Sequence, residues 1–281
     1  GTTVSAPASI VIDIVDDVPN AVNDGVYNVV EDGASLVSGN VLTNDLHANG
    51  LPGADTPTSF VAWGAGDAAT IAALNTYGTL VQDPATGAWS YTLDNGRAAT
   101  QALDSTFSQN FVLNYTMQDA DGDTDTATLT ITITGANDGP TVTVDQGNGG
   151  ANDQVFEAGL NASGSNAASA SEFAGGTFTL ADADGLSDLQ SVTITGVGAP
   201  VTFTIAQLTG ATPGAPLVVP GDHGTLRITG YAAGVATYTY ELTEATSDLA
   251  GIEQDSFSVT VTDGTTVSAP ASIVIDIVDD V

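Results

Sequence analysis

The first eighteen residues of the chain return unchanged at its carboxyl end. Residues 1–18 read GTTVSAPASIVIDIVDDV, and residues 264–281 read the same without a mismatch. Self-similarity at a fixed period indicates a repeat protein, here with a period of 263 residues from Gly1 to Gly264. A period of this length exceeds one ordinary domain, so we expect more than one folded unit per repeat. A duplicated end that is foreign to the protein is the alternative explanation.

A weaker repeat divides this period into two halves. GTLVQDPATGAWSYTL (78–93) aligns with GTLRITGYAAGVATYTYEL (224–242), and segment 111–140 aligns loosely with 257–281. We expect a domain boundary near Gly139 and Pro140, with one domain over residues 18–139 and a second over residues 140–281. Residues 1–17 are then expected to be the last strand of a preceding repeat.

Nearly all of the secondary structure is predicted to be β. Alternating or β-branched runs such as SIVIDIV, ATYTYEL, FSVTVTD and ATLTITITG are typical of strands. The turns are supplied by ATG, DNG, ADG and NDGP. Short strands at regular spacing indicate an all-β fold, here two tandem Greek-key β-sandwich domains in an elongated array. The Ala-rich segments 65–73 and 167–174 are expected to form a helical turn or two at most.

The charge balance is extreme and points to a cation. The chain has 34 Asp and Glu against 2 Lys and Arg, for a formal net charge of −32. This charge excludes most nucleic-acid and anionic-membrane roles, because both need basic patches. The carboxylates repel one another in a compact state unless positive charge lies among them, and Ca²⁺ prefers oxygen ligands. General solubility or adaptation to high salt is the alternative, but 28 of the acids are Asp, many of them in short Gly-containing loops.

The absence of cysteine and of targeting segments limits the class of protein further. Cysteine is absent, which excludes disulfides, thiolate metal sites and a Cys nucleophile. The sequence shows no signal peptide, transmembrane span or lipidation motif. We therefore interpret the chain as an internal part of a longer protein, and the absence of Cys is compatible with secretion.

Placing the acids on seven antiparallel strands, A to G, brings a first set to the entry end of domain 1. The FG turn reads DADGD, in which alternate Asp residues around a Gly can present several oxygens to one ion. We expect this turn to lie near the acids of the entering segment and near the end of a B-like strand. The predicted ligands are Asp16, Asp17, Asp45, Asp119, Asp121 and Asp123.

A second set is expected at the junction between the two domains. It combines the linker, the BC loop and FG turn of domain 2, and two acids from the far end of domain 1: Glu31, Asp94, Asn137, Asp138, Asp182, Asp184, Asp188 and Asp263. Matching positions at the far end of domain 2 form half of a further junction: Glu157, Glu244, Asp279 and Asp280. Each single Asp of a DG turn could instead be a turn former, so the prediction of several Ca²⁺ ions depends on the convergence of separate segments.

Several motifs together resemble a known family. The exit motif GANDGP, the entry VVEDG with NVLTND, the FG loop DADGDTD and the segment GTL with AWSYTLDN are similar to the cadherin-like or VCBS-type repeats of large RTX adhesins. The resemblance covers residues 19–140 well and residues 140–281 more loosely, because NDGP is replaced by DDV and the second FG loop shortens to DGTT.

The resemblance implies a fold, a role and a location. These adhesins are type I secreted proteins of Gram-negative bacteria, with many Ig-like domains in series. Calcium at the linkers makes the array a rigid extender that holds a terminal ligand-binding domain away from the cell, for adhesion or biofilm formation. The RTX nonapeptide GGxGxDxUx does not occur here, so we do not interpret this segment as the secretion-signal region.

An enzyme is not expected. His47 and His223 are the only histidines, and the sequence contains no HExxH, GxSxG or P-loop motif. The acids lie in DxD loops, which suit ion binding better than general acid catalysis.

A carbohydrate-binding or surface-binding module is the alternative function. It requires exposed aromatic side chains. Trp89 and Tyr91 share one face of a strand and are predicted to pack in the core, whereas the exposure of Trp63 is left open.

The expected partners are adjacent repeats of the same chain. Nucleic acid and membrane insertion are not expected, and the fragment is expected to be monomeric in solution. The apolar residues 1–17 lack a sandwich of their own. They are either disordered or pair in trans with an open sheet edge of a neighbouring molecule.

Overall fold

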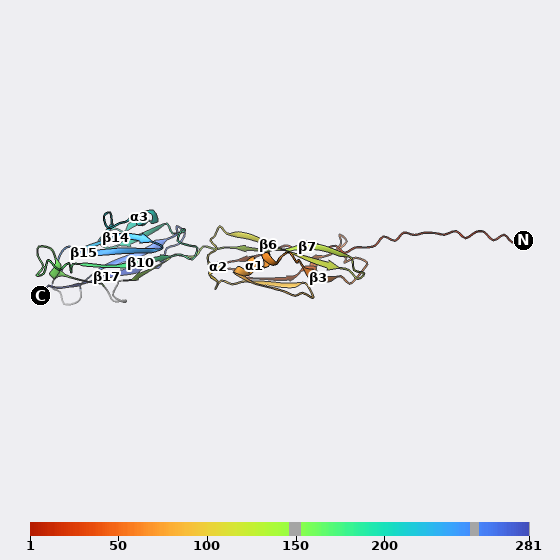
Figure 1. Ribbon diagram of the computed structural model, residues 1–281, viewed down its shortest axis with the longest axis horizontal. Coiled ribbons are helices and arrows are strands. Elements are labelled where there is room, and N and C mark those ends of the chain that lie inside the picture. Colours follow the sequence, from red (N-terminus) through yellow and green to blue (C-terminus); the bar gives the residue numbers. More distant parts are fainter. Residues whose placement is uncertain (146–152, 248–252, 281) are drawn as a thin grey trace. The chain divides into compact units, whose positions relative to one another are not determined.

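The computed structural model describes residues 1–145, 153–247 and 253–280. The chain divides into two compact units, Gly1–Ala136 and Asn137–Val281 (Figure 1). This division lies close to the expected boundary at Gly139 and Pro140. The predicted second domain also includes residues 146–152, 248–252 and Val281, which lie outside the described residues.

The first unit is a two-layer β-sandwich. One sheet has the order β1-β7-β6-β3 and the other has the order β2-β5-β4. The strands are β1 (Val26–Val30), β2 (Leu36–Asn40), β3 (Ser59–Trp63), β4 (Gly78–Gln82), β5 (Ala88–Leu93), β6 (Ser108–Gln118) and β7 (Thr124–Thr134). Three short helices accompany them: η1 (Val41–Asn44), α1 (Ala68–Tyr77) and α2 (Ala98–Gln101). The predicted all-β sandwich is confirmed.

One pairing in this unit departs from the expected antiparallel pattern. β1 lies parallel to β7, with Val26 opposite Thr130 and Val30 opposite Thr134. In an up-and-down order of seven strands, the first and the seventh run in the same direction. When they become neighbours in one sheet, they can only pair in parallel.

The core of the first unit follows the period of two along its strands. Phe111, Leu113 and Tyr115 of β6 are buried, and the residues between them are exposed. On β5, Trp89 is 4% exposed and Tyr91 is 0% exposed, so the predicted core role of both is confirmed. Successive side chains of a strand point to opposite faces, which explains why one face of each sheet is apolar.

The Ala-rich segment of the first unit forms a longer helix than expected. α1 runs for 10 residues, beyond the predicted turn or two. Leu74 is buried, and Ile71 and Tyr77 pack against the core cluster. Residues three apart share a helix face, so this apolar stripe carries the helix past the Ala patch. The second Ala-rich segment, 167–174, forms turns and the start of β10 instead.

The second unit is also a sandwich, with two five-stranded sheets of order β12-β11-β16-β17-β9 and β13-β14-β15-β10-β8. Its core cluster is separate from that of the first unit. The strands are β8 (Thr141–Asp145), β9 (Asp153–Phe156), β10 (Phe173–Ala181), β11 (Ser191–Thr195), β12 (Val201–Thr204), β13 (Leu217–Pro220), β14 (Gly224–Ala232), β15 (Val235–Leu242), β16 (Glu253–Thr262) and β17 (Ala271–Val278). The helices are η2 (Glu157–Gly159) and α3 (Ile205–Gly210). The extra strands β12 and β13 flank α3, in a stretch with no counterpart in the aligned internal repeat.

The aligned GTL segments form equivalent hairpins, β4–β5 and β14–β15. In both, the glycine lies against a buried tyrosine. A Cβ on Gly78 would lie 2.7 Å from the Tyr91 hydroxyl oxygen, and one on Gly224 would lie 2.3 Å from that of Tyr240. Both contacts are closer than any side chain tolerates, which explains why each motif begins with glycine.

The duplicated terminal sequence has two different structures. Residues 271–278 form β17, which pairs antiparallel with β16 and parallel with β9. Residues 1–25 form neither helix nor strand, although residues 1–18 have the same sequence as 264–281. The expected strand is therefore not formed at the amino end, because neighbours like β16 and β9 do not flank it there.

Candidate metal centres

The turn between β6 and β7 gathers three carboxylates. Asp119, Asp121 and Asp123 each offer an oxygen, and these oxygens all lie within 4.8 Å of one another. The amides of Gly122 and Asp123 donate to Asp119 Oδ1 at 3.1 and 2.9 Å. Asp119 is 5% exposed, and its Oδ2 has no hydrogen-bond donor in the described part of the chain. Gly122 has φ +108°, which permits the sharp bend.

A second group shares Asp121 with the first. Oxygens of Asp16, Asp55 and Asp121 also lie within 4.8 Å of one another. The backbone binds the two loops together, because the amide of Ala120 donates to the carbonyl oxygen of Asp55 at 3.1 Å. Sequence reasoning missed Asp55. The available signal was its position in the loop before β3, which corresponds to the loop of the second unit in which Asp182 and Asp184 were predicted.

Asp17 and Asp45 lie outside both groups. Asp17 Oδ2 accepts a hydrogen bond from the amide of Ala54, and its Oδ1 lies 3.9 Å from His47 Nε2. Asp45 is 3% exposed, and its Oδ1 accepts hydrogen bonds from the amide of Val22 and the hydroxyl of Tyr115, both at 2.8 Å. Asp45 was predicted to lie beside the FG turn. The short η1 helix ends just before Asp45 and turns it toward the core instead.

The shared carboxylates perturb one another. The neighbouring Asp119 side chain, followed by partial desolvation, raises the pKa of Asp121, and the charges of Asp119 and Asp16 add to this effect. Desolvation, followed by the charges of Asp16 and Asp119, raises the pKa of Asp55. A bound cation would relieve this repulsion.

At the other end of the first unit, the two predicted ligands are separately engaged. Glu31 is 1% exposed and accepts hydrogen bonds from Gln101 Nε2 at 3.3 Å and from the amide of Ala136 at 3.1 Å. Asp94 is exposed and pairs with Arg97, with Nε 3.1 Å from Oδ2. The structure does not bring these two acids into one of its carboxylate groups.

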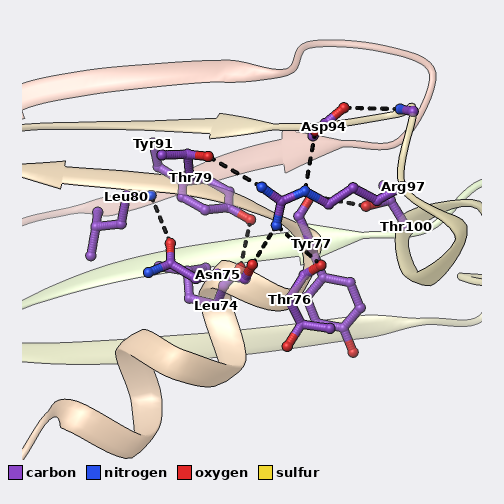
Figure 2. Close-up of polar contacts among 11 residues, drawn as sticks. Leu74, Asn75, Thr76, Tyr77, Thr79, Leu80, Tyr91, Asp94, Arg97 and Thr100 are labelled. Atoms are coloured by element: carbon purple, nitrogen blue, oxygen red, sulfur yellow. Dashed lines mark hydrogen bonds and ion pairs between the residues drawn. The ribbon is translucent and has the colours of Figure 1, made fainter.

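Figure 2 shows the Arg97 contacts around this exposed pair. The guanidinium donates to the carbonyl oxygens of Asn75 and Thr76 at the end of α1, and to the hydroxyl of Thr79 on β4. The carboxyl end of a helix carries partial negative charge. Arg97 therefore joins the end of α1 to the turn after β5, and Asp94 has a cationic partner without a metal ion.

The second unit has its own group in the loop after β10. Oxygens of Asp182, Asp184 and Asp188 lie within 4.8 Å of one another. Asp182 Oδ2 and Asp184 Oδ1 are buried atoms for which the described residues supply no hydrogen-bond donor. Burial, followed by the charges of Asp184 and Asp188, raises the pKa of Asp182.

The linker residues join this group within the second unit. The amide of Asp138 donates to Asp184 Oδ2 at 2.9 Å, and Asn137 Nδ2 donates to Asp263 Oδ2 at 2.9 Å. Burial alone would raise the pKa of Asp263, but hydrogen bonds from Thr266, Asn137 and Thr265 lower it to about 2. The structure thus brings all six predicted residues of this unit to the same end: Asn137, Asp138, Asp182, Asp184, Asp188 and Asp263.

At the opposite end of the second unit, carboxylates from three separate segments form another group. Oxygens of Glu157, Glu253 and Asp279 lie within 4.8 Å of one another. The hydroxyl of Thr246 donates to Glu157 Oε1 at 2.7 Å. Glu253 was not among the predicted ligands, and its Oε2 is a buried atom with no donor among the residues described.

The carboxylates of the other two predicted residues at this end lie outside this group, although the amide of Asp280 donates to Glu157 Oε2 at 3.5 Å. Asp280 accepts hydrogen bonds from Ser165, including one from its amide at 2.6 Å. Glu244 is absent from the carboxylate groups that the described chain contains, and its amide donates to the carbonyl oxygen of His223. Glu253, at the start of β16, therefore lies beside Glu157 and Asp279, where Glu244 was predicted.

The chemistry of these groups fits a hard divalent cation. Every donor atom is an oxygen, and each group includes at least one carboxylate oxygen with no hydrogen-bond donor within residues 1–145, 153–247 and 253–280, or shares Asp121 with a group that does. Ca²⁺ takes about six to eight oxygen ligands from carboxylates, carbonyls and water. The residues therefore fit calcium better than a softer metal.

Trp63 and Tyr77, the two aromatic residues considered for a binding surface, pack against other aromatic side chains. Trp63 is half-buried and packs against Phe60 at 5.3 Å and Tyr115 at 6.4 Å between ring centroids. Tyr77 packs against Phe107 and Phe111. These contacts assign both side chains to the core of the first unit.

Across the described ranges, no helix combines the length and apolar character needed to span a membrane.

Comparisons with known proteins give a family for the first unit. Residues 16–135 match the bacterial cadherin-like domain family. No curated protein matches the chain in sequence. Solved structures with a similar fold include the EC1-4 fragment of PcdhgB3, with 14% identity over 95% of this chain and 50% of that chain and a TM-score of 0.41. The Protocadherin GammaB4 extracellular domain has 14% identity over 95% and 33%, with a TM-score of 0.40. The human Desmocollin-1 ectodomain has 13% identity over 94% and 42%, with a TM-score of 0.32. The chain spans half or less of the length of each of these three.

Proposed function

From the match of residues 16–135 to the bacterial cadherin-like domain family, we propose that the whole chain is a calcium-stiffened spacer built of extracellular, adhesion-type modules. In this role, tandem sandwiches add length, and calcium limits the movement of the segments that connect them. The full protein would project a distal ligand-binding domain from a bacterial surface after type I secretion, for adhesion or biofilm formation. The proposal assigns no catalytic residue.

One observation carries this proposal. The linker residues Asn137 and Asp138 are hydrogen-bonded to Asp263 and Asp184, beside the Asp182–Asp188 group. Immediately before them, the amide of Ala136 is bound to Glu31 of the first unit. An ion held by the Asp182–Asp188 group would fix the linker to the second unit and leave little free chain between the two units.

The electrostatics support the same role. With a net charge of −32 and no Lys, the protein supplies almost no internal counter-charge. Calcium that binds the folded units and not the unfolded chain would stabilise them by mass action. We therefore expect folding and stiffening to be favoured in calcium-rich surroundings and weakened in a calcium-poor cytoplasm.

Small-angle scattering of the whole chain tests the proposal. In millimolar calcium we expect a longer and more uniform particle than in excess chelator. Asp184→Asn, which removes the charge of one carboxylate of the group, should show the chelated behaviour at calcium concentrations that stiffen the native chain. An exposed acid gives the matched control, Asp13→Asn. A scattering curve that calcium leaves unchanged would overturn the proposal.

A further inference from the structure

A set of buried oxygens in the first unit lies outside the carboxylate groups described above. Asp24 Oδ2, Asn44 Oδ1 and Asp45 Oδ2 are buried atoms, and none has a hydrogen-bond donor among the described residues. Asp45 is 3% exposed, so its unsatisfied oxygen is cut off from bulk water. Buried polar atoms without a partner are rare in folded proteins, and a water molecule or an ion is a common partner for them.

Backbone contacts of Val22 hold these residues together. The Val22 amide donates to Asp45 Oδ1 at 2.8 Å, and its carbonyl oxygen accepts from Asn44 Nδ2 at 2.9 Å. Asn44 Nδ2 also donates to the carbonyl oxygen of Asn23, the residue before Asp24. These hydrogen bonds hold the segment before β1 against the end of η1. One side-chain oxygen each of Asp24, Asn44 and Asp45 is left without a hydrogen-bond donor among the described residues.

The protein has no cation of its own for this place. Its only basic residues are two Arg and two His. Arg97 pairs with Asp94, Arg227 pairs with Glu241 and His47 faces Asp17, while His223 belongs to the second unit. Burial, followed by the charge of Asp45, raises the pKa of Asp24 to about 7. The two carboxylates therefore act on each other without a compensating positive charge from the chain.

We propose that Asp24, Asn44 and Asp45 form an internal divalent-cation site of the first unit, distinct from the groups that contain Asp121. Two carboxylates and an amide oxygen are hard ligands of the kind that Ca²⁺ takes, and water fills its remaining positions. Asp125 adds negative charge at the edge of the site, where its Oδ2 accepts a hydrogen bond from the amide of Ala21. The bound ion fixes the entry of the chain into β1. This site does not depend on the spacer function.

Calcium counting on the whole chain tests the proposal. Asp24→Asn keeps the shape of the side chain and removes one anionic ligand. We expect equilibrium dialysis to give one fewer bound Ca²⁺ per chain for this variant, or an affinity for that ion lower by about tenfold or more. Asp13→Asn, which removes the same charge from an exposed residue, should bind as the native chain does. An unchanged count and affinity in Asp24→Asn would overturn the proposal and assign the three oxygens to water or a shared proton.

Terbium luminescence provides a second readout if Asp24→Asn fails to fold. The Tyr115 hydroxyl donates to Asp45 at 2.8 Å, so a Tb³⁺ ion at the site should be sensitised by excitation of Tyr115. Tyr115→Phe should lose most of this emission. Because Trp63 lies 6.4 Å from Tyr115 between ring centroids and also sensitises Tb³⁺, the overturning result is emission as strong as that of the native chain after Tyr115→Phe and Trp63→Phe are made together.

The results also separate this site from the spacer function. Asp121→Asn should leave the tyrosine-sensitised emission in place while it removes calcium from the other groups. If the scattering curve does not respond to calcium but Asp24→Asn still lowers the calcium count, the spacer proposal fails and the internal site stands. If calcium changes the scattering curve but Asp24→Asn leaves the calcium count and affinity unchanged, only the proposal of the internal site fails.

Discussion

Ile273 is fully buried in β17, whereas Ile10, which has the same neighbours in sequence, is 89% exposed. The difference comes from tertiary context alone. β16 pairs with Ile273, and β9 pairs with residues 275–278 on the other side of the same strand. A β-strand cannot satisfy its own backbone groups, so an apolar, β-branched sequence is not enough to form one.

Hydrogen exchange should report this contrast directly. We expect the amides around Ile275 to be strongly protected and those around Ile12, in the identical sequence, to exchange at nearly unfolded rates. Ile275→Ala should lower the free energy of unfolding of the second unit by about 2–5 kcal/mol. The matched change Ile12→Ala should alter stability by less than about 0.5 kcal/mol. Equal protection of the two copies would contradict this prediction.

Arg97 should contribute more to stability than the other arginine. It donates to the end of α1, to β4 and to Asp94, and is 34% exposed. We expect Arg97→Ala to lower the free energy of unfolding of the first unit by about 1–2 kcal/mol, because several charge-assisted hydrogen bonds are lost together. Arg227→Ala removes a half-exposed pair with Glu241 and should cost the second unit about 0–1 kcal/mol. Denaturant unfolding of the whole chain, with hydrogen exchange used to monitor each unit separately, measures both changes. A larger loss for Arg227→Ala would show that the helix contacts of Arg97 are dispensable.

Local patterns predicted the parts of the fold that depend on neighbours in sequence. The alternation of Trp89 and Tyr91 placed both in the core, and the fold class followed from the spacing of strands and turns. The acids of the DADGD turn lie together because they are near in sequence and Gly122 allows the bend. The length of α1 was missed because the apolar stripe that extends it lies beyond the Ala-rich segment.

Ligand sets built from distant segments were harder to predict. Asp45 and Asp55 both lie in the connection between β2 and β3. Only the turn formed by η1 decides that Asp45 faces the core while Asp55 faces Asp121. Sequence spacing does not contain that information, because the choice depends on contacts with Tyr115 and Val22 far along the chain.

Asp153 should give the second unit a pH dependence of its own. Burial raises the pKa of this carboxyl above its ordinary value of 3.8, although the Tyr238 hydroxyl donates to it at 3.0 Å. A raised pKa in the folded state means that the folded unit binds the proton more tightly than the unfolded chain does. The contribution of Asp153 is therefore most favourable below pH 3.8 and is lost as the pH rises through the folded-state pKa.

Asp153→Asn should remove this dependence. The Asn side chain stays neutral, and its carbonyl oxygen can still accept the Tyr238 hydrogen bond. We expect the variant to gain stability relative to the native chain between pH 4 and pH 7, measured by denaturant unfolding in calcium-free buffer. Asp83→Asn should show the opposite trend and lose stability as the pH rises above 3.8, since hydrogen bonds from Ala85 and Thr86 lower the pKa of Asp83 in the folded state. A difference between Asp153→Asn and the native chain that does not change with pH would contradict the prediction.

Asp121 should matter more for calcium binding than Asp123. Asp121 belongs to both carboxylate groups of the first unit, and Asp123 belongs to one. We expect Asp121→Asn to weaken calcium binding at this end by about tenfold or more, with a smaller loss in Asp123→Asn. Calorimetric titration of both variants against the native chain measures the difference. Equal losses would mean that the two groups do not share an ion-binding residue.

The far end of the second unit provides the sharpest test of structure against sequence. The sequence analysis assigned Glu244 to this end, whereas the structure brings Glu253 to within 4.8 Å of Glu157 and Asp279. Glu253 Oε2 is buried and finds no donor in the described part of the chain. We expect Glu253→Gln to weaken calcium binding here by about tenfold, because a neutral amide replaces a carboxylate ligand.

Glu244→Gln is the matched control for this end, because it makes the same chemical change two residues after β15. We expect its calcium titration to overlay that of the native chain, since Glu244 has no place in the group with Glu157. If Glu244→Gln weakens binding and Glu253→Gln does not, the alignment of Glu244 with Asp94 is the better guide. The β16 assignment of the ligand would then be wrong.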